Sequence, residues 1–206
     1  IFALFISSCS NSSQNNSNIN ENPIDLATSS SNASHLYNSM YINFALDRSL
    51  YDDALLMFTK NINNIDDTKL FYRLTKIALL SYKYDQADLI ATKWLKLQPS
   101  TYLPYQFSII TYLENNQFDK AQITFQNYLK NIKPKSKNDF SKLMNALSEN
   151  KNRLNVMKFF DNYLLSNNNR ELHLSYIELL YIFNMPLKVI ATIEELGTFN
   201  ERNLIR

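Results

Sequence analysis

A four-residue pattern that returns at a fixed interval constrains this chain more than any other feature of its sequence. The pattern is an aromatic residue, Asp, any residue and Ala, and its copies end at Ala54, Ala87 and Ala121. The copies are therefore 33 and 34 residues apart. An interval of this size is typical of repeat proteins, in which each unit packs only against its neighbours. We therefore expect an array of similar units.

The segments around these copies have the apolar spacing of helices. Leu70, Leu74 and Ile77 are three or four residues apart, which places them on one face of a helix. Pro99 and Pro104 mark the next break, because proline cannot continue a helix interior. The only glycine among 206 residues is Gly197, and the tight turns of an all-β fold need more. These features predict an all-α fold.

The repeat resembles the tetratricopeptide repeat (TPR), a helix-turn-helix unit of 34 residues. In that family the Ala lies where two helices cross closely, the aromatic residue caps the turn, and proline ends the second helix. Val156 and Val189 continue the series in two degenerate copies, whereas Thr75 and Ile109 replace the consensus glycine. The resemblance implies a right-handed superhelical solenoid of about five hairpins. The expected units are 35–67, 68–101, 102–135, 136–169 and 170–201.

The first residues resemble the end of a bacterial lipoprotein signal peptide. An apolar run over 1–6 leads into Ser7, Ser8 and Cys9, the only cysteine, which would accept the lipid. Residues 10–34 are rich in Ser and Asn and are expected to form a disordered tether. The repeat domain would then span 35–206. By the same resemblance, Ser10 favours an outer-membrane lipoprotein that faces the periplasm.

Both ends of the chain indicate that it is a piece of a longer protein. It does not begin with Met and has no basic segment before the apolar run. Residues 201–206 read like the start of another helix. We therefore expect further repeats or another domain beyond these residues.

Composition limits the chemistry that the chain can perform. One Cys and two His make a Cys/His metal site implausible, and one Gly excludes the glycine-rich loops that bind nucleotides. A net charge of +2 is too small for a general nucleic-acid binder. The paired carboxylates are expected to cap helices. We therefore predict no catalytic residues, no metal, no cofactor, no nucleic acid and no small-molecule substrate.

The resemblance implies a concave groove, lined by the first helix of each unit, that binds another protein. The residues assigned to the groove are Asn43, Asp47, Tyr72, Arg73, Lys76, Gln106 and Ile110. A basic run over 130–158 could contact anionic lipid or an acidic partner, or could form a solvated loop. The predicted function is a lipid-anchored, non-catalytic adaptor that binds another envelope protein or peptide segment. Two alternatives stay open: a self-associating structural lipoprotein, and the recognition arm of a longer protein.

Overall fold

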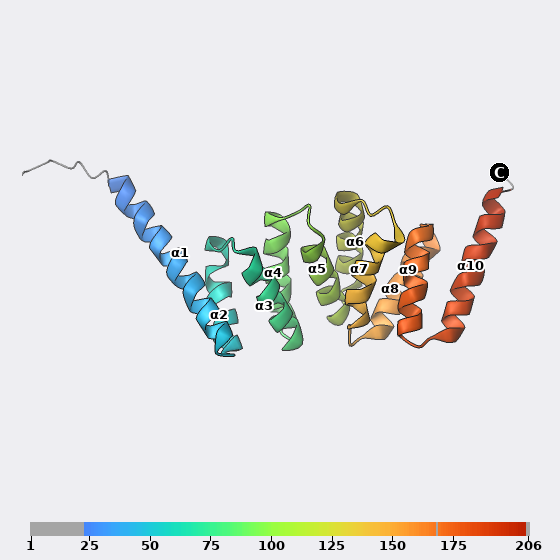
Figure 1. Ribbon diagram of the computed structural model, residues 1–206, viewed down its shortest axis with the longest axis horizontal. Helices are drawn as coiled ribbons and strands as arrows, with labels where there is room; N and C mark the ends of the chain where they lie inside the picture. The colour runs from blue at the N-terminus through green and yellow to red at the C-terminus, as the bar shows by residue number, and fades with distance from the viewer. Residues whose placement is uncertain (1–22, 168, 205–206) are drawn as a thin grey trace, which may run out of the picture.

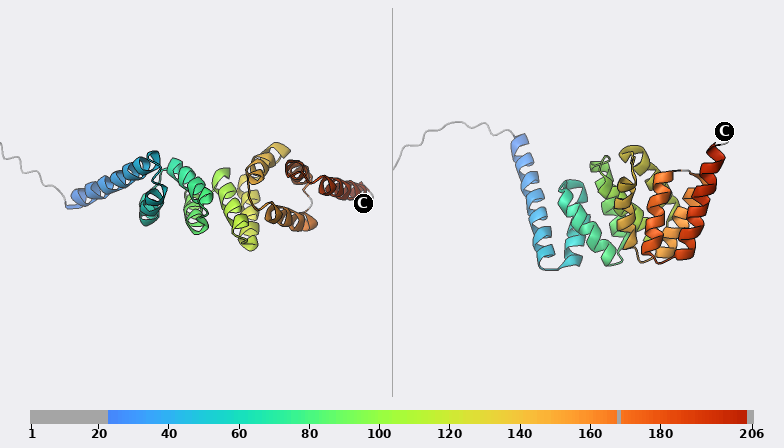
Figure 2. Two further views of the ribbon diagram at one scale, coloured as in Figure 1. Left: turned by 90° about the horizontal axis from the view of Figure 1, so that it is seen from below. Right: turned by 45° about the vertical axis from the view of Figure 1, so that its right-hand side comes forward.

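The described residues form an array of helical hairpins. The structure, a computed structural model, describes residues 23–167 and 169–204, with only the backbone for 23–32 and 198–204. In this part of the chain there are ten α-helices, a 3₁₀ turn (Ile62–Asn64) and no strand. The helices are α1 (Pro23–Asp47), α2 (Tyr51–Asn61), α3 (Thr68–Leu80), α4 (Tyr84–Leu97), α5 (Tyr102–Glu114), α6 (Phe118–Ile132), α7 (Lys137–Ser148), α8 (Arg153–Ser166), α9 (Arg170–Ile182) and α10 (Pro186–Leu204). They follow one another in chain order, with α1 and α10 at opposite ends (Figures 1 and 2). The all-α prediction is confirmed.

Four of the five hairpins turn in the same way. One residue of each turn adopts a left-handed conformation: Ser49, Tyr82, Asn116 and Asn184, with φ of 59, 58, 57 and 58°. After α3, the Lys83 N–H donates to the Ala78 carbonyl at 2.8 Å and the Tyr82 N–H to the Leu79 carbonyl at 3.1 Å. This is a Schellman motif, which pairs the last carbonyls of a helix and usually contains glycine. The chain forms it without glycine, twice with Asn, which tolerates this conformation well.

The fourth hairpin has a longer turn, and this explains the shift in the repeat interval. Four residues, 149–152, separate α7 from α8, whereas three residues, 81–83, separate α3 from α4. The Asn155 amide donates to the Leu113 carbonyl and to Asn116 Oδ1, both at 2.7 Å. The start of α8 is thereby tied to the turn of the preceding hairpin.

The residues of the repeated pattern occupy the predicted positions. Ala54, Ala87 and Ala121 are fully buried, and the aromatic residue of each copy is the first residue of α2, α4 or α6. The buried apolar side chains form two clusters, one over residues 42–107 and the other over 105–183. Helix α5 joins them, because Phe107 belongs to the first cluster and Ile109 to the second. The core therefore extends along the array.

The structure corrects the predicted boundary between the tether and the repeat domain. Helix α1 begins at Pro23, so residues 23–34 are helical where a disordered tether was expected. Proline is favourable at the first helical position, and extending an existing helix costs far less than nucleating one. Cys9, the signal segment 1–9 and residues 10–22 of the tether lie outside the described residues. Among the described helices, none has both the length and the apolar character needed to span a membrane.

Candidate binding groove

A groove of about 470 Å³ opens along the first helices of the second, third and fourth hairpins. Its lining comes from α3, α5 and α7, with Tyr84 at the start of α4 and residues 149–151 of the turn before α8. Tyr72, Phe107 and Ile110 form its apolar floor. We call this surface the groove from here on.

Four of the seven predicted site residues line the groove: Tyr72, Lys76, Gln106 and Ile110. They occupy two equivalent positions of successive repeats, since Gln106 follows Tyr72, and Ile110 follows Lys76, by 34 residues. The Tyr72 ring meets the ring of Phe107 edge to face, with 5.6 Å between centroids. The repeat interval therefore placed the same helix face correctly in two hairpins.

The other three predicted residues lie in a separate cluster between α1 and α3. The Arg73 guanidinium donates to Asn43 Oδ1 and to Asp47 Oδ1, both at 3.0 Å. Arg73 and Asp47 form an ion pair on the surface. None of the three lines the groove. Their contacts join the first two hairpins, so the structure divides the predicted site into a groove and an inter-repeat contact.

The sequence analysis missed the wall that the fourth hairpin contributes. Lys142 and Asn145 of α7, together with Glu149 and Lys151, line the groove opposite α3 and α5. The fourth unit lacks the aromatic-Asp-x-Ala pattern, so its helix face could not be assigned by counting. The basic run over 130–158 was the available signal, because it contains both lysines.

The cations of this wall lie beside aromatic rings. Lys151 Nζ is 3.9 Å from the centroid of the Tyr82 ring, and Lys142 Nζ is 5.6 Å from that of Tyr102. A hydrogen bond to the Tyr82 phenol raises the pKa of Lys151, so its charge is retained at neutral pH. The backbone N–H of Lys151 donates to Glu114 Oε1 at 2.8 Å. Burial, followed by the charge of Glu114, raises the pKa of the Tyr84 phenol.

Asn150 brings a buried amide to the lining of the groove. Its side chain is 4% exposed, and its Oδ1 accepts a hydrogen bond from the Asn152 backbone at 2.8 Å. Its Nδ2 has no hydrogen-bond acceptor within the described residues. A buried donor without an acceptor costs about 1–3 kcal/mol. A carbonyl oxygen placed beside Nδ2 would recover part of that cost.

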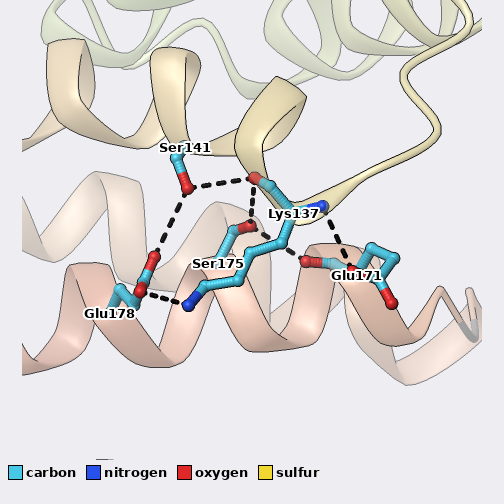
Figure 3. A network of polar contacts seen from close by, with 5 residues as sticks. All are labelled: Lys137, Ser141, Glu171, Ser175 and Glu178. Carbon is cyan, nitrogen blue, oxygen red and sulfur yellow. Dashed lines mark hydrogen bonds and ion pairs between the residues drawn. The ribbon is translucent and has the colours of Figure 1, made fainter.

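A polar network holds α7 in place against α9 (Figure 3). The Lys137 carbonyl accepts hydrogen bonds from Ser141 Oγ at 3.0 Å and Ser175 Oγ at 3.2 Å. The Lys137 N–H donates to Glu171 at 3.1 Å, and its ammonium pairs with Glu178. The two serines are small enough to let the helices approach closely. The network therefore fixes the helix that carries one wall of the groove.

The described residues outside the groove offer little reactive chemistry. They contain no group of three or more His, Cys, Asp or Glu side chains that could hold a metal ion. His173 is buried in α9, with Nδ1 3.0 Å from the Asn169 carbonyl oxygen. The groove combines an apolar floor with a charged rim, a lining suited to holding an apolar side chain beside polar groups.

No protein-family model matches the chain, and no curated protein matches it.

Proposed function

We propose that this chain is a non-catalytic adaptor of the bacterial cell envelope that binds a segment of another protein in the groove. The observation that carries the proposal is the groove itself, with its apolar floor and its rim of lysines and glutamates. A volume of about 470 Å³ lies within the range of sites that enclose a small ligand or a few side chains. A row of hairpins presents such a surface without any loop insertion.

The chemistry of the lining favours a peptide with an apolar anchor residue. Tyr72, Phe107 and Ile110 offer the partner an apolar surface, and aromatic residues are common anchors at protein interfaces. The unpaired Nδ2 of Asn150 is a donor that suits a main-chain carbonyl of the partner. Together these groups suit an extended segment that buries one large apolar side chain.

The rim favours acidic residues beside that anchor. Lys76, Lys142 and Lys151 line the groove with Glu114 and Glu149, and Glu114 already accepts the backbone N–H of Lys151. Lys76 takes part in no ion pair or hydrogen bond with the residues that the structure describes, so it is available to a ligand carboxylate. The surplus of lysine therefore complements an acidic partner.

The proposal includes the resemblance to TPR lipoproteins. In this proposal the five hairpins wind into a right-handed superhelix, and lipid on Cys9 anchors the chain to the outer membrane on its periplasmic side. Replacement of Cys9 by Ser should release the chain from the membrane fraction into the soluble periplasmic fraction. An unchanged distribution would refute the lipid anchor and leave the groove untouched.

The groove is tested by crosslinking in the native envelope. The double variant Tyr72→Ala/Lys76→Ala removes part of the floor and one rim cation. A matched control, Ile123→Ala/Lys130→Ala, changes exposed residues of α6 that do not line the groove. Arg73→Ala is a second control, because Arg73 lies in the inter-repeat contact. We expect one dominant partner, lost only in the groove variant; equal recovery in all three would refute the site.

A further inference from the structure

The two ends of the array expose apolar side chains at positions that the internal hairpins bury. Hairpins can be compared position by position, because Ser49, Tyr82, Asn116 and Asn184 mark the same point of the turn in four of them. Counting from these residues identifies equivalent positions on the helices on either side. The burial of equivalent positions then shows what the end helices lack.

At the carboxyl end the unpartnered face belongs to α10. Ile193 lies nine residues after its turn residue, as do Phe58, Ala91 and Phe125 in their hairpins. Those three side chains are fully buried, whereas Ile193 is 51% exposed. Ile190, one helical turn earlier, is 54% exposed. The internal residues are covered by neighbouring helices of the array, and α10 lacks such a neighbour within the described residues.

At the amino end the unpartnered face belongs to α1. Tyr37 lies twelve residues before its turn residue, at the position of Leu70 and Leu172, which are buried. Phe44 lies five residues before the turn, at the position of Leu179, which is fully buried. Tyr37 and Phe44 are 63% and 51% exposed. Met40 lies between them on the same face and is also exposed.

We propose that a second copy of this chain covers these faces, with α1 of one molecule packed against α10 of the next. The two faces are the two halves of the contact that joins neighbouring hairpins inside the chain: a second helix on one side and a first helix on the other. Solenoids that stay monomeric in solution carry polar end helices, and these ends are apolar. A head-to-tail contact of this kind does not close on itself, so it builds a linear assembly.

The assembly leaves the groove open, because α3, α5 and α7 are not at the ends of the array (Figure 1). Self-association and partner binding are therefore independent in this proposal. Failure of one would leave the other standing.

Sedimentation velocity of the full 206-residue chain tests the contact. The wild-type mass should rise with concentration beyond that of a dimer. Ile193→Lys and Tyr37→Lys each place a charge in the contact, which should raise its dissociation constant at least about tenfold. Both substitutions are at exposed positions, and circular dichroism will check that the fold is kept. Ile123→Lys in α6, which is 59% exposed and away from the ends, should assemble like the wild type.

Mixing the two variants gives the sharpest result. Ile193→Lys keeps an intact α1 face, and Tyr37→Lys keeps an intact α10 face, so an equimolar mixture should form dimers that grow no further. A wild-type chain that stays monomeric at about 1 mM would overturn the proposal. So would a single variant that still dimerises, because the contact would then join two copies of one face, or a mixture that stays monomeric.

Discussion

Replacing Phe125 by Ala should unfold the second half of the array before the first. Phe125 of α6 is fully buried and its ring meets four other aromatic rings. The nearest, Tyr163, lies at a centroid distance of 4.9 Å with the planes at 87°. Phe159 and Phe160 of α8 lie at 5.7 and 5.8 Å. The side chain therefore joins the third hairpin to the fourth.

The expected loss follows from burial and the cavity left behind. Truncation of a fully buried Phe to Ala costs about 3–5 kcal/mol, which combines lost transfer energy with an incompletely closed cavity. We expect about 4 kcal/mol, because α6 and α8 both supply rings that cannot easily collapse into the space. With a urea dependence of about 2 kcal/mol/M, the unfolding midpoint should fall by about 2 M.

The assay uses two probes that report different parts of the chain. Trp94, the only tryptophan, lies in the first cluster, with its ring 6.4 Å from Phe71 and 6.0 Å from Phe107. Its fluorescence reports the first cluster, whereas far-ultraviolet circular dichroism reports all helices. In an array stabilised by nearest-neighbour contacts, the dichroism midpoint should fall further than the fluorescence midpoint.

A matched control lies two residues away on the same helix. Ile123 is exposed, so Ile123→Ala should change stability by less than about 0.5 kcal/mol. A loss below about 1.5 kcal/mol in Phe125→Ala would refute the packing argument. If both probes shifted by the full amount together, the clusters would unfold as one unit, and the description of an extended core would be wrong.

Three further predictions concern turns and titrating groups. Ser49→Gly should raise stability in urea by about 0.5–1 kcal/mol, because Ser49 holds a left-handed conformation that glycine adopts freely. Hydrogen bonds from Lys135 and Ser136 lower the pKa of Asp139, so its stabilisation is present above pH 3.8 and is lost as the pH falls through the lowered pKa. Asp139→Asn should therefore be less stable than the wild type at neutral pH, with the difference closing in acid denaturation curves. Burial, aided by a nearby carboxylate, raises the pKa of Tyr112 from 10.0 to about 12. Its contribution to stability is complete below pH 10 and is lost as the pH rises to about 12, so tyrosinate absorbance and circular dichroism should show alkaline unfolding over that interval.

The helical array could be predicted from the sequence because repetition reports each position several times. Three copies of the pattern placed Ala54, Ala87 and Ala121 at buried helix positions, and α3, α5 and α9 begin at the first residue of their predicted units. The same counting placed Tyr72 and Lys76 on the helix face that lines the groove. A local pattern was sufficient because each hairpin packs mainly against its neighbours.

The remaining features depend on contacts that a local pattern does not encode. Arg73 is adjacent to Tyr72 on α3, yet its long side chain reaches α1 and pairs with Asp47. Lys142 lines the groove from a hairpin that lacks the repeated pattern and has a longer turn. Residues 23–34 were expected to be unstructured from their polar composition, yet they continue the helix that begins at Pro23. Composition alone underestimated how readily a helix extends.

Site-specific photo-crosslinking from the groove tests the central claim most directly. A photoreactive side chain in place of Gln106 would lie in the groove, and one in place of Gln126 would lie exposed on α6, away from the groove. In the native envelope we expect Gln106 to crosslink to one other protein, through an acidic segment with a large apolar residue, and Gln126 to give no such product. Equal products from both positions, or products from Gln106 that contain only this chain, would contradict the assignment of the groove as a binding site for another protein.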